Sequence, residues 1–333
     1  MNQESEMDIP IAIFIFKRVD KTKRIINRIA EVKPKKIYII SDGPRNDYEI
    51  EIVKKCREMA EKAITWDCEV IKNYSEKNRG VYENIGLGAK WVFEREEMAI
   101  FLEDDNLPDL SFFTFCQQLL HKFKDDEKIM WICGTNYLEK YENEEKSSYV
   151  FTQHLLPCGW ASWSKKFLKY YDGDLNGLNE DSIFDIQKTY SNKKLYKQQS
   201  NLMIREKKRI EKHLKPISWD YQMEFSIRKN NLFGISPTKN LIENIGVDED
   251  SIHGGTSYNN IMTERFCSMK TYPLNFPLVH PSNIEIDSKY EKKINKIILY
   301  PLRDRLKQKI SMLIRNVFRI ESENPLFYKL RKK

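Results

Sequence analysis

The sequence has neither the cysteine pattern of a disulfide-rich or zinc-binding protein nor an apolar run long enough to cross a membrane. Its six cysteines are scattered along 333 residues without a Cys-x-x-Cys pair, which predicts reduced thiols in a cytosolic protein. Its longest apolar stretches, such as residues 9–16, fall far short of the roughly 18 to 20 residues that a membrane span needs. The first residues are polar and acidic, and they predict no signal peptide.

The sequence also lacks the glycine-rich loops that commonly hold phosphate groups. Neither the phosphate-loop pattern G-x-x-x-x-G-K-[ST] nor the dinucleotide pattern G-x-G-x-x-G occurs. If this chain binds a diphosphate, we therefore expect a metal ion to hold it.

The net charge of +7 is unevenly distributed along the chain. Residues 289–333 contain fourteen Lys and Arg and four acidic residues, a net charge of +10, so residues 1–288 carry a net charge of −3. The basic character thus belongs to the C-terminal segment, and the two parts are interpreted separately. We expect a single large domain over residues 1–288 and a basic tail over residues 289–333.

Strand and helix patterns alternate over the first 140 residues. Strands are expected at residues 9–16, 36–40, 68–71, 98–102 and 128–133, and helices at residues 20–32, 47–62, 80–96 and 109–123. This order predicts an α/β fold with a parallel sheet and helices on both faces. In such sheets, ligands bind beyond the carboxyl ends of the strands.

The pattern is less regular in the second half of the chain. Residues 159–163 predict a tight aromatic turn, and residues 182–214 and 219–229 predict helices. Residues 244–258 predict a loop that is too long for an ordinary connection. No internal repeat and no low-complexity linker occurs.

Three consecutive acids, residues 103–105, directly follow the apolar run 99–102. A buried carboxylate is costly unless it is paired or bound to a cation. Mg²⁺ and Mn²⁺ suit such a place, because they take one or two carboxylates and fill their other positions with water and phosphate oxygens. A solvated strand end followed by a helix capped by Asp109 would also explain the acids. Asp42, at a neighbouring strand end, favours the metal interpretation.

Six motifs occur in an order and spacing that resemble GT-A-fold glycosyltransferases, specifically the N-acetylglucosaminyltransferase I type and related bacterial family-2-like enzymes. They are FKRVDKTKRIINRI, IISDGP, EDD followed by LPDLSFF, CGWASW, WDYQMEF and SIHGGTSY. The resemblance covers about residues 9–270. It implies a Rossmann-like GT-A fold with a mostly parallel central sheet. Its donor-binding half is expected at about residues 9–140, and its acceptor and base half at about residues 141–288.

The resemblance implies a role for individual residues. Asp105 would bind Mn²⁺ or Mg²⁺, Asp104 would contact the sugar or ribose, and Asp220 would be the catalytic base. The other implied donor contacts are Arg18 facing the nucleotide, Asp42 at the uracil base, Trp160 beside the donor sugar and His253 in a loop that closes over the diphosphate. Arg79 precedes a helix whose N-terminus faces the same strand ends, and it is a further candidate for the donor phosphate.

Three of these side chains also have a simpler interpretation. Asp220 could cap a helix, His253 could be an exposed loop residue, and Trp160 could belong to the core. The sequence departs from the family pattern in two places. Gly88 stands where closer members carry a histidine, and about residues 175–210, where acceptor choice usually resides, have no match.

Residues 294–320 predict an amphipathic helix in the C-terminal tail. Its apolar stripe comprises Leu302, Leu306, Ile310, Leu313, Ile314 and Val317, and its basic flanks comprise Arg303, Lys307, Lys309, Arg315 and Arg319. This pattern is typical of a helix that lies in a membrane interface. A packed terminal helix or a dimer contact would use the same stripe. Nucleic acid is not expected as a partner, because nucleic-acid binding depends on basic contacts with phosphates, to which an apolar stripe contributes little.

Together these features predict a metal-dependent, inverting glycosyltransferase. It would move a sugar from a nucleotide-diphosphate donor, expected to be a UDP-sugar, to a glycan or lipid-linked acceptor in surface polysaccharide synthesis. We expect it in the cytoplasm, at the inner face of the cell membrane. The alternatives are a sugar nucleotidyltransferase and a non-catalytic nucleotide-sugar-binding protein.

Overall fold

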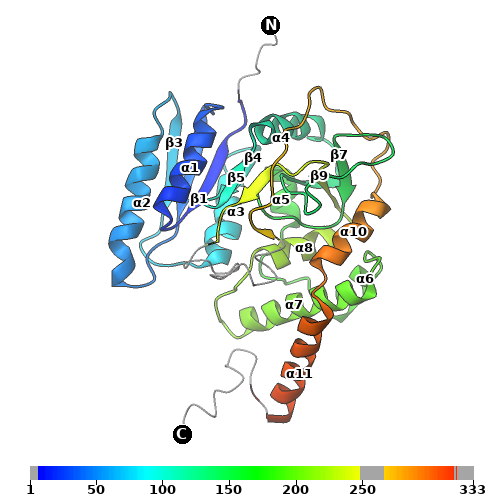
Figure 1. The fold of residues 1–333 in the computed structure, drawn as a ribbon. Coiled ribbons are helices and arrows are strands. Elements are labelled where there is room, and N and C mark those ends of the chain that lie inside the picture. The colour runs from blue at the N-terminus through cyan, green and yellow to red at the C-terminus, as the bar shows by residue number, and fades with distance from the viewer. Residues whose placement is uncertain (1–6, 248–265, 319, 321–333) are drawn as a thin grey trace.

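The computed structural model describes residues 7–247, 266–318 and 320 (Figure 1). Strands and helices alternate along the first half of the chain, as the sequence predicts. These elements are β1 (Ile11–Ile15), α1 (Val19–Ala30), β2 (Lys36–Ser41), η1 (Asp47–Glu49), α2 (Ile50–Ala63), β3 (Glu69–Tyr74), η2 (Tyr82–Leu87), α3 (Gly88–Phe93), β4 (Met98–Glu103), β5 (Asn106–Pro108), α4 (Leu110–Lys122) and β6 (Ile129–Cys133). The second half contains β7 (Tyr149–Thr152), β8 (Trp160–Trp163), α5 (Ser164–Tyr170), α6 (Glu180–Gln187), α7 (Lys193–Glu211), α8 (Asp220–Lys229), β9 (Phe233–Pro237), β10 (Ile242–Asn244), α10 (Ser288–Ile298) and α11 (Leu302–Phe318).

An eight-stranded sheet forms the centre of the molecule, with the strand order β3-β2-β1-β4-β8-β6-β9-β7. The first four strands in this order are mutually parallel, and β6 is parallel to β9. β8 runs antiparallel to both of its neighbours, β4 and β6. The prediction of a mostly parallel α/β sheet is confirmed. The prediction of an aromatic turn at residues 159–163 is wrong, because the short Trp-Ala-Ser-Trp segment is buried between two strands, and so short a run carries no periodic signal.

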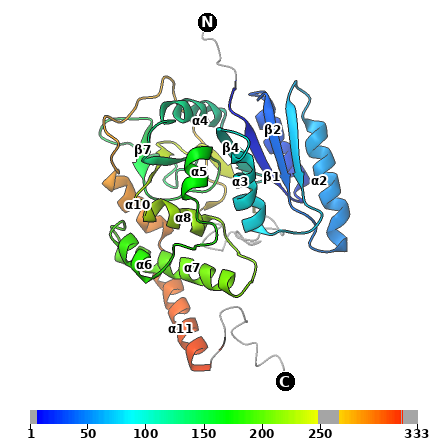
Figure 2. The ribbon, with the colours of Figure 1, turned by 180° about the vertical axis from the view of Figure 1, so that it is seen from behind.

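Two layers of helices cover the sheet (Figures 1 and 2). Along β1, Ile11, Ile13 and Ile15 point to the side that is covered by α1, α2 and α4, whereas Ala12 and Phe14 point to the side covered by α3, α5 and α8. This alternation follows from the two-residue period of an extended strand. Both faces of the parallel strands are therefore buried, as expected for a sheet of this class.

The long polar stretch that predicted one helix over residues 182–214 forms two helices instead. α6 begins after Asn179, whose side chain accepts a hydrogen bond from the backbone of Ser182. α7 begins after Asn192, whose side chain accepts from Lys194 and Leu195. Each asparagine satisfies the first free N–H groups of its helix, so the second cap starts a new helix.

The C-terminal segment divides into a packed helix and a projecting one. Tyr290 and Ile294 of α10 are fully buried, and the carboxylate of Glu291 accepts hydrogen bonds from the Thr152 hydroxyl and the Gln153 backbone. α10 therefore packs on the body of the molecule, although all but its first residue lie in the segment from residue 289 that was expected to form the tail. Pro301 separates α10 from α11, which projects from the body (Figure 1). Within the described residues, no helix is both long enough and apolar enough to span a membrane.

Truncation tests this division of the C-terminal segment. A chain lacking residues from Leu302 onward should keep the free energy of unfolding of the full chain. A chain lacking residues from Ser288 onward should lose at least about 4 kcal/mol, because it loses the burial of two large side chains, and the buried donors of Thr152 and Gln153 lose the Glu291 carboxylate. Urea unfolding measures both values, and equal stability of the two truncated chains would contradict the division.

Candidate active site

The carboxyl ends of β1 and β4 lie side by side, since Ile13 pairs with Leu102 and Phe14 pairs with Glu103. The acids Asp104 and Asp105 form the turn between β4 and β5. Arg18 lies just beyond β1, at the start of α1. The pairing of these two strands therefore brings the acids and the arginine together at one edge of the sheet.

Arg18 is the positive partner of the acidic turn. Its Nη1 lies 3.0 Å from Oδ1 of Asp104 and 2.8 Å from Oδ2 of Asp105. The backbone N–H of Phe16 also donates to Asp104, at 3.3 Å. The sequence predicts a metal ion in this role and predicts that Arg18 faces a nucleotide. In the structure, one side chain of the protein itself contacts both carboxylates.

Burial changes the acidity of the turn. It raises the pKa of Asp104 to about 6, and the positive charge of Arg18 acts in the opposite direction. Burial also raises the pKa of Glu103, and Asp105, Asp104 and Asp220 raise it further. The folded chain thus holds several carboxyl groups in a poorly solvated place, where each disfavours the ionisation of the others.

Asp220 is the first residue of α8, and it lies close enough to Glu103 to raise the pKa of that carboxyl. The Ser218 hydroxyl donates to the Asp220 carboxylate and accepts from the backbone N–H of Tyr221, at 3.0 Å. Ser218 therefore makes the capping bond that the simpler interpretation assigned to Asp220. The structure brings the predicted base from the second half of the chain toward the acidic turn of the first half.

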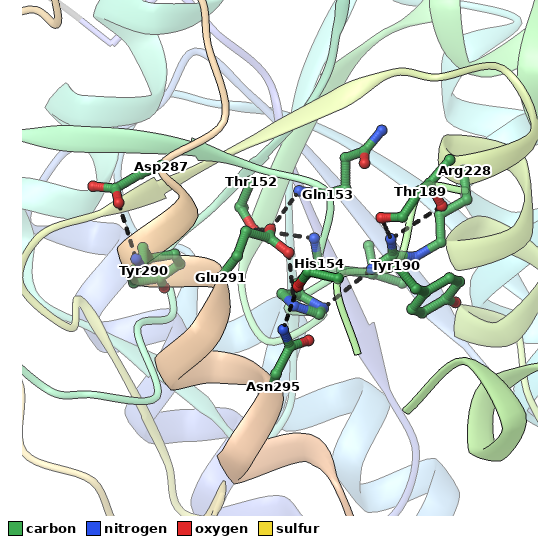
Figure 3. Close-up of polar contacts among 12 residues, drawn as sticks. Thr152, Gln153, His154, Thr189, Tyr190, Arg228, Asp287, Tyr290, Glu291 and Asn295 are labelled. Carbon is green, nitrogen blue, oxygen red and sulfur yellow. Dashed lines mark hydrogen bonds and ion pairs between the residues drawn. The ribbon is translucent and has the colours of Figure 1, made fainter. Parts of the chain in front are cut away.

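A buried polar network anchors the other end of α8 (Figure 3). Arg228 donates to Thr189 O at 3.0 Å and to Nδ1 of His154 at 3.2 Å. Nε2 of His154 lies 3.0 Å from a carboxylate oxygen of Glu291 on α10. Because arginine can only donate, Nδ1 of His154 accepts and its proton lies on Nε2, facing Glu291. The network joins α8 to α10 and thereby fixes the helix that carries Asp220.

Asp42 lies at the end of β2, as predicted, but its carboxylate is already fully engaged. It accepts from the backbone N–H groups of Gly43, Arg79 and Gly80 and from the Asn78 side chain, at 2.6 to 3.0 Å. Its side chain is buried. In this structure Asp42 thus holds the loop at residues 78–80 in place, with two protein donors on each carboxylate oxygen.

Arg79 is also held by the protein. Its guanidinium donates to the side chains of Asn73 at 3.1 Å and Asn84 at 3.0 Å. Burial lowers its pKa, while Asp42 acts in the opposite direction. Nε of Arg79 is buried without a hydrogen-bond partner. The side chain connects β3 to η2, next to the loop that Asp42 organises.

Two other predicted donor contacts cannot be placed in this site. Trp160 is 1% exposed, and its ring is stacked between Phe101 at 4.0 Å and Trp131 at 4.2 Å, measured between ring centroids. The expected contact with the donor sugar is therefore corrected to a core role. His253 lies outside the described residues.

The acidic turn can supply oxygen ligands to a hard cation. Within the described ranges, no group of three or more His, Cys, Asp or Glu side chains converges in a way that could hold a metal ion. Mn²⁺ and Mg²⁺ need only one or two carboxylates when phosphate and water complete their shell. A methyl group at Gly246 would lie 2.4 Å from Oδ2 of Asp105, so a residue without a side chain is needed there for the carboxylate to keep its position. Asp105 and its surroundings thus fit such an ion.

The sequence analysis missed two residues of this site. Ser218 precedes Asp220 by two positions, and Asn106 directly follows the acidic turn; the Asn106 amide donates to Asp105 at 2.7 Å. The polar side chain of Asn106 within an otherwise apolar Asn-Leu-Pro segment was the available signal. Its buried position could not be read from the sequence, because β5 pairs with the distant strand β10.

No protein-family model and no curated protein matches this sequence. Among solved structures, a mannosyltransferase from Pyrobaculum calidifontis in complex with GDP-Man and Mn²⁺ is 12% identical, with a TM-score of 0.37 and coverage of 67% of this chain and 72% of that one. A UDP-glucose pyrophosphorylase complexed with UDP-glucose is 10% identical, with a TM-score of 0.34 and coverage of 71% and 93%.

A cytidylyltransferase from Leptospira borgpetersenii is 12% identical, with a TM-score of 0.31 and coverage of 49% of this chain. The match spans 63% of the cytidylyltransferase, less than two thirds of its length. Sugar-transferring and nucleotide-transferring enzymes thus both occur among the similar structures. At these low scores, the similarities carry no argument about what this chain binds or does.

The raised pKa of Asp104 predicts a pH-dependent stability. The pKa of Asp104 is 3.8 ordinarily and about 6 in the folded chain. At a pH between these two values, Asp104 keeps its proton in the folded chain and has released it in the unfolded chain. Stability from this group is therefore lost as the pH rises through that range. The Asp104→Asn variant cannot ionise there. As the pH rises from about 4 to 7, the free energy of unfolding of this variant should increase by about 1 to 3 kcal/mol relative to that of the wild type.

Urea unfolding across this pH range measures the gain. Arg18→Met is the companion variant, because removal of the positive charge should extend the loss of stability to higher pH. A difference between Asp104→Asn and the wild type that does not change with pH would contradict the assignment.

Proposed function

We propose that this chain is a metal-dependent, inverting glycosyltransferase that uses a nucleotide-diphosphate sugar, expected to be a UDP-sugar. The observation that carries the proposal is the packing of the start of α8 against the strand that ends in the acidic turn. Trp219, directly before Asp220, packs on Trp160 at 5.7 Å between ring centroids, and Trp160 stacks at 4.0 Å on Phe101 of β4. A transferase of this kind needs two carboxylates at one reaction centre. One carboxylate holds the donor through a cation, and the other accepts a proton from the acceptor hydroxyl.

Asp105 would hold the cation, and Asp104 would contact the sugar or ribose of the donor. Mn²⁺ or Mg²⁺, when bound, would act as a Lewis acid that stabilises the negative charge of the leaving diphosphate. Arg18 is already bonded to both carboxylates, and its charge would add to the neutralisation of the phosphates. The three side chains thus bind and orient the donor.

Asp220 would accept the proton of the acceptor hydroxyl as that hydroxyl attacks the anomeric carbon. The attack comes from the face opposite the leaving diphosphate, so the configuration at that carbon inverts. Ser218, which donates to the Asp220 carboxylate, would orient the base. A carboxylate within reach of the reacting hydroxyl is the requirement for general-base catalysis.

Two alternatives differ in what they require of the same site. A sugar nucleotidyltransferase would need a glycine-rich phosphate loop after β1, and the segment FKRVDKTKR contains no glycine. A non-catalytic nucleotide-sugar-binding protein would not need Asp220 near the acidic turn. The arrangement therefore favours transfer to an acceptor, which we propose to be a glycan or a lipid-linked sugar in surface polysaccharide synthesis.

We also propose that α11 holds the protein on the inner face of an anionic membrane. Its apolar stripe is exposed in the structure, with Leu302, Leu306, Ile310, Leu313 and Val317 between 49% and 68% exposed. Basic residues flank this stripe, and a second copy of the helix would bring like charges together. The pattern suits a lipid surface, where lysine and arginine reach the headgroups.

The first test of the proposed function concerns the base. With a panel of nucleotide sugars and Mn²⁺, the wild type should release the nucleotide slowly by donor hydrolysis and faster with an acceptor. Asp220→Asn keeps the shape of the side chain but cannot accept the proton, so turnover with acceptor should fall roughly 10²- to 10⁴-fold at unchanged donor affinity. Ser218→Ala is the matched control for the loss of orientation alone, and its effect should be smaller. Turnover of Asp220→Asn within a few-fold of the wild type would place the base elsewhere.

The second test concerns the membrane. Lys307→Gln combined with Lys309→Gln should weaken sedimentation with anionic vesicles by roughly 30-fold at low salt, since each basic residue contributes about 1 kcal/mol, and high salt should reduce the difference. Leu306→Ser combined with Leu313→Ser should weaken binding at every salt concentration. A full chain that ignores anionic vesicles, together with a changed oligomeric state in the leucine variant, would show that α11 packs on protein.

A further inference from the structure

Asn106 is a buried amide that connects the acidic turn to another part of the sheet. It is 1% exposed and opens β5, opposite Asn244 of β10. Its Nδ2 donates to Oδ1 of Asp105 at 2.7 Å, and its Oδ1 accepts from the backbone N–H of Gly159 at 2.9 Å. One side chain therefore spans the gap between Asp105 and the segment that leads into β8.

The chemistry of the two partners fixes the direction of this amide. The Gly159 N–H can only donate, so it must face the oxygen of Asn106, and the NH₂ group must face Asp105. Gly159 is itself held in place, because its own carbonyl accepts from Gly134 at 2.7 Å. A side chain at Gly159 is excluded, since its φ is +62° and a Cβ would lie 2.4 Å from Ile242. The donor that reaches Asp105 thus belongs to a rigid part of the fold.

Two further groups restrict Asp105. Arg18 donates to its Oδ2 at 2.8 Å, and the backbone of Gly246 lies so close to the same oxygen that a Cβ would approach it to 2.4 Å. The two oxygens of Asp105 are therefore directed by different neighbours, Asn106 on one and Arg18 on the other. A carboxylate bound in this way keeps one orientation before any ligand arrives.

We propose that Asn106 is a positioning residue that orients Asp105 for a divalent cation bound together with a nucleotide diphosphate. This inference rests on the proposed function of the site. Groups that bond a metal-binding carboxylate set its direction, and their loss typically lowers metal affinity or activity by about 10- to 100-fold. Asn106 meets this description, since it contacts Asp105 and does not belong to the residues proposed to touch the donor.

Calorimetric titration of the full chain with UDP, once with Mn²⁺ and once with EDTA, tests the proposal. The ratio of the two affinities reports the metal-dependent part of binding. In Asn106→Ala this ratio should fall about 10- to 100-fold, with the affinity in EDTA unchanged. Gly246→Ala, which displaces the same carboxylate from its other side, should lower the ratio as well. This second variant keeps the test decisive if Asn106→Ala does not fold.

Asn295→Ala is the matched control. Asn295 of α10 is also buried, at 4% exposure. Its side-chain amide donates a hydrogen bond to the Ser191 hydroxyl at 2.8 Å. Its loss should lower the melting temperature without changing the ratio. If Asn106→Ala lowers both affinities equally, or leaves the ratio intact, the positioning role is wrong.

Asp105→Ala separates this outcome from a failure of the proposed function. It should abolish the metal-dependent part of binding. If the wild type shows no such part, or Asp105→Ala retains it, the metal site itself is wrong, and the proposal for Asn106 is overturned with it.

Discussion

The contact between the Arg18 guanidinium and the carboxylates of Asp104 and Asp105 is the interaction on which the rest of the site depends. The parallel pairing of β1 and β4 places an acidic turn at the end of two buried strands that are apolar up to Glu103. Ionised groups in such a place need a counter-charge. Arg18, directly after β1, supplies it, so the strand that positions the acids also positions their partner.

The second half of the chain is built to bring one more acid to this turn. Asp220 opens α8, whose preceding residue Trp219 packs on Trp160 of β8 at 5.7 Å between ring centroids, and the far end of the same helix is tied to α10 through Arg228, His154 and Glu291. Breaking one member would leave another buried charge unpaired, which is costly. Burial raises the pKa of Glu103 and of Asp104, and the neighbouring carboxylates raise both further. The packing of the fold thus keeps these carboxylates close together although their charges repel each other.

The sequence was sufficient for the features that depend on local pattern. The alternation of strands and helices, the position of the acids after β4 and the start of α8 near Asp220 were predicted correctly. Features that depend on distant partners were not. The stacking of Trp160 in the core, the saturation of Asp42 by the loop at residues 78–80 and the burial of α10 all arise from contacts between segments far apart in the chain.

The central claim is that the carboxylate of Asp105, oriented by its protein neighbours, receives a divalent cation together with a nucleotide diphosphate. Anomalous X-ray scattering from crystals grown with Mn²⁺ and UDP tests it most directly. The account predicts a manganese peak within coordination distance of Asp105, about 2.0 to 2.2 Å for a small hard cation, with phosphate oxygens in its shell. Nucleotide bound without a peak at Asp105, or a peak elsewhere in the molecule, would contradict it.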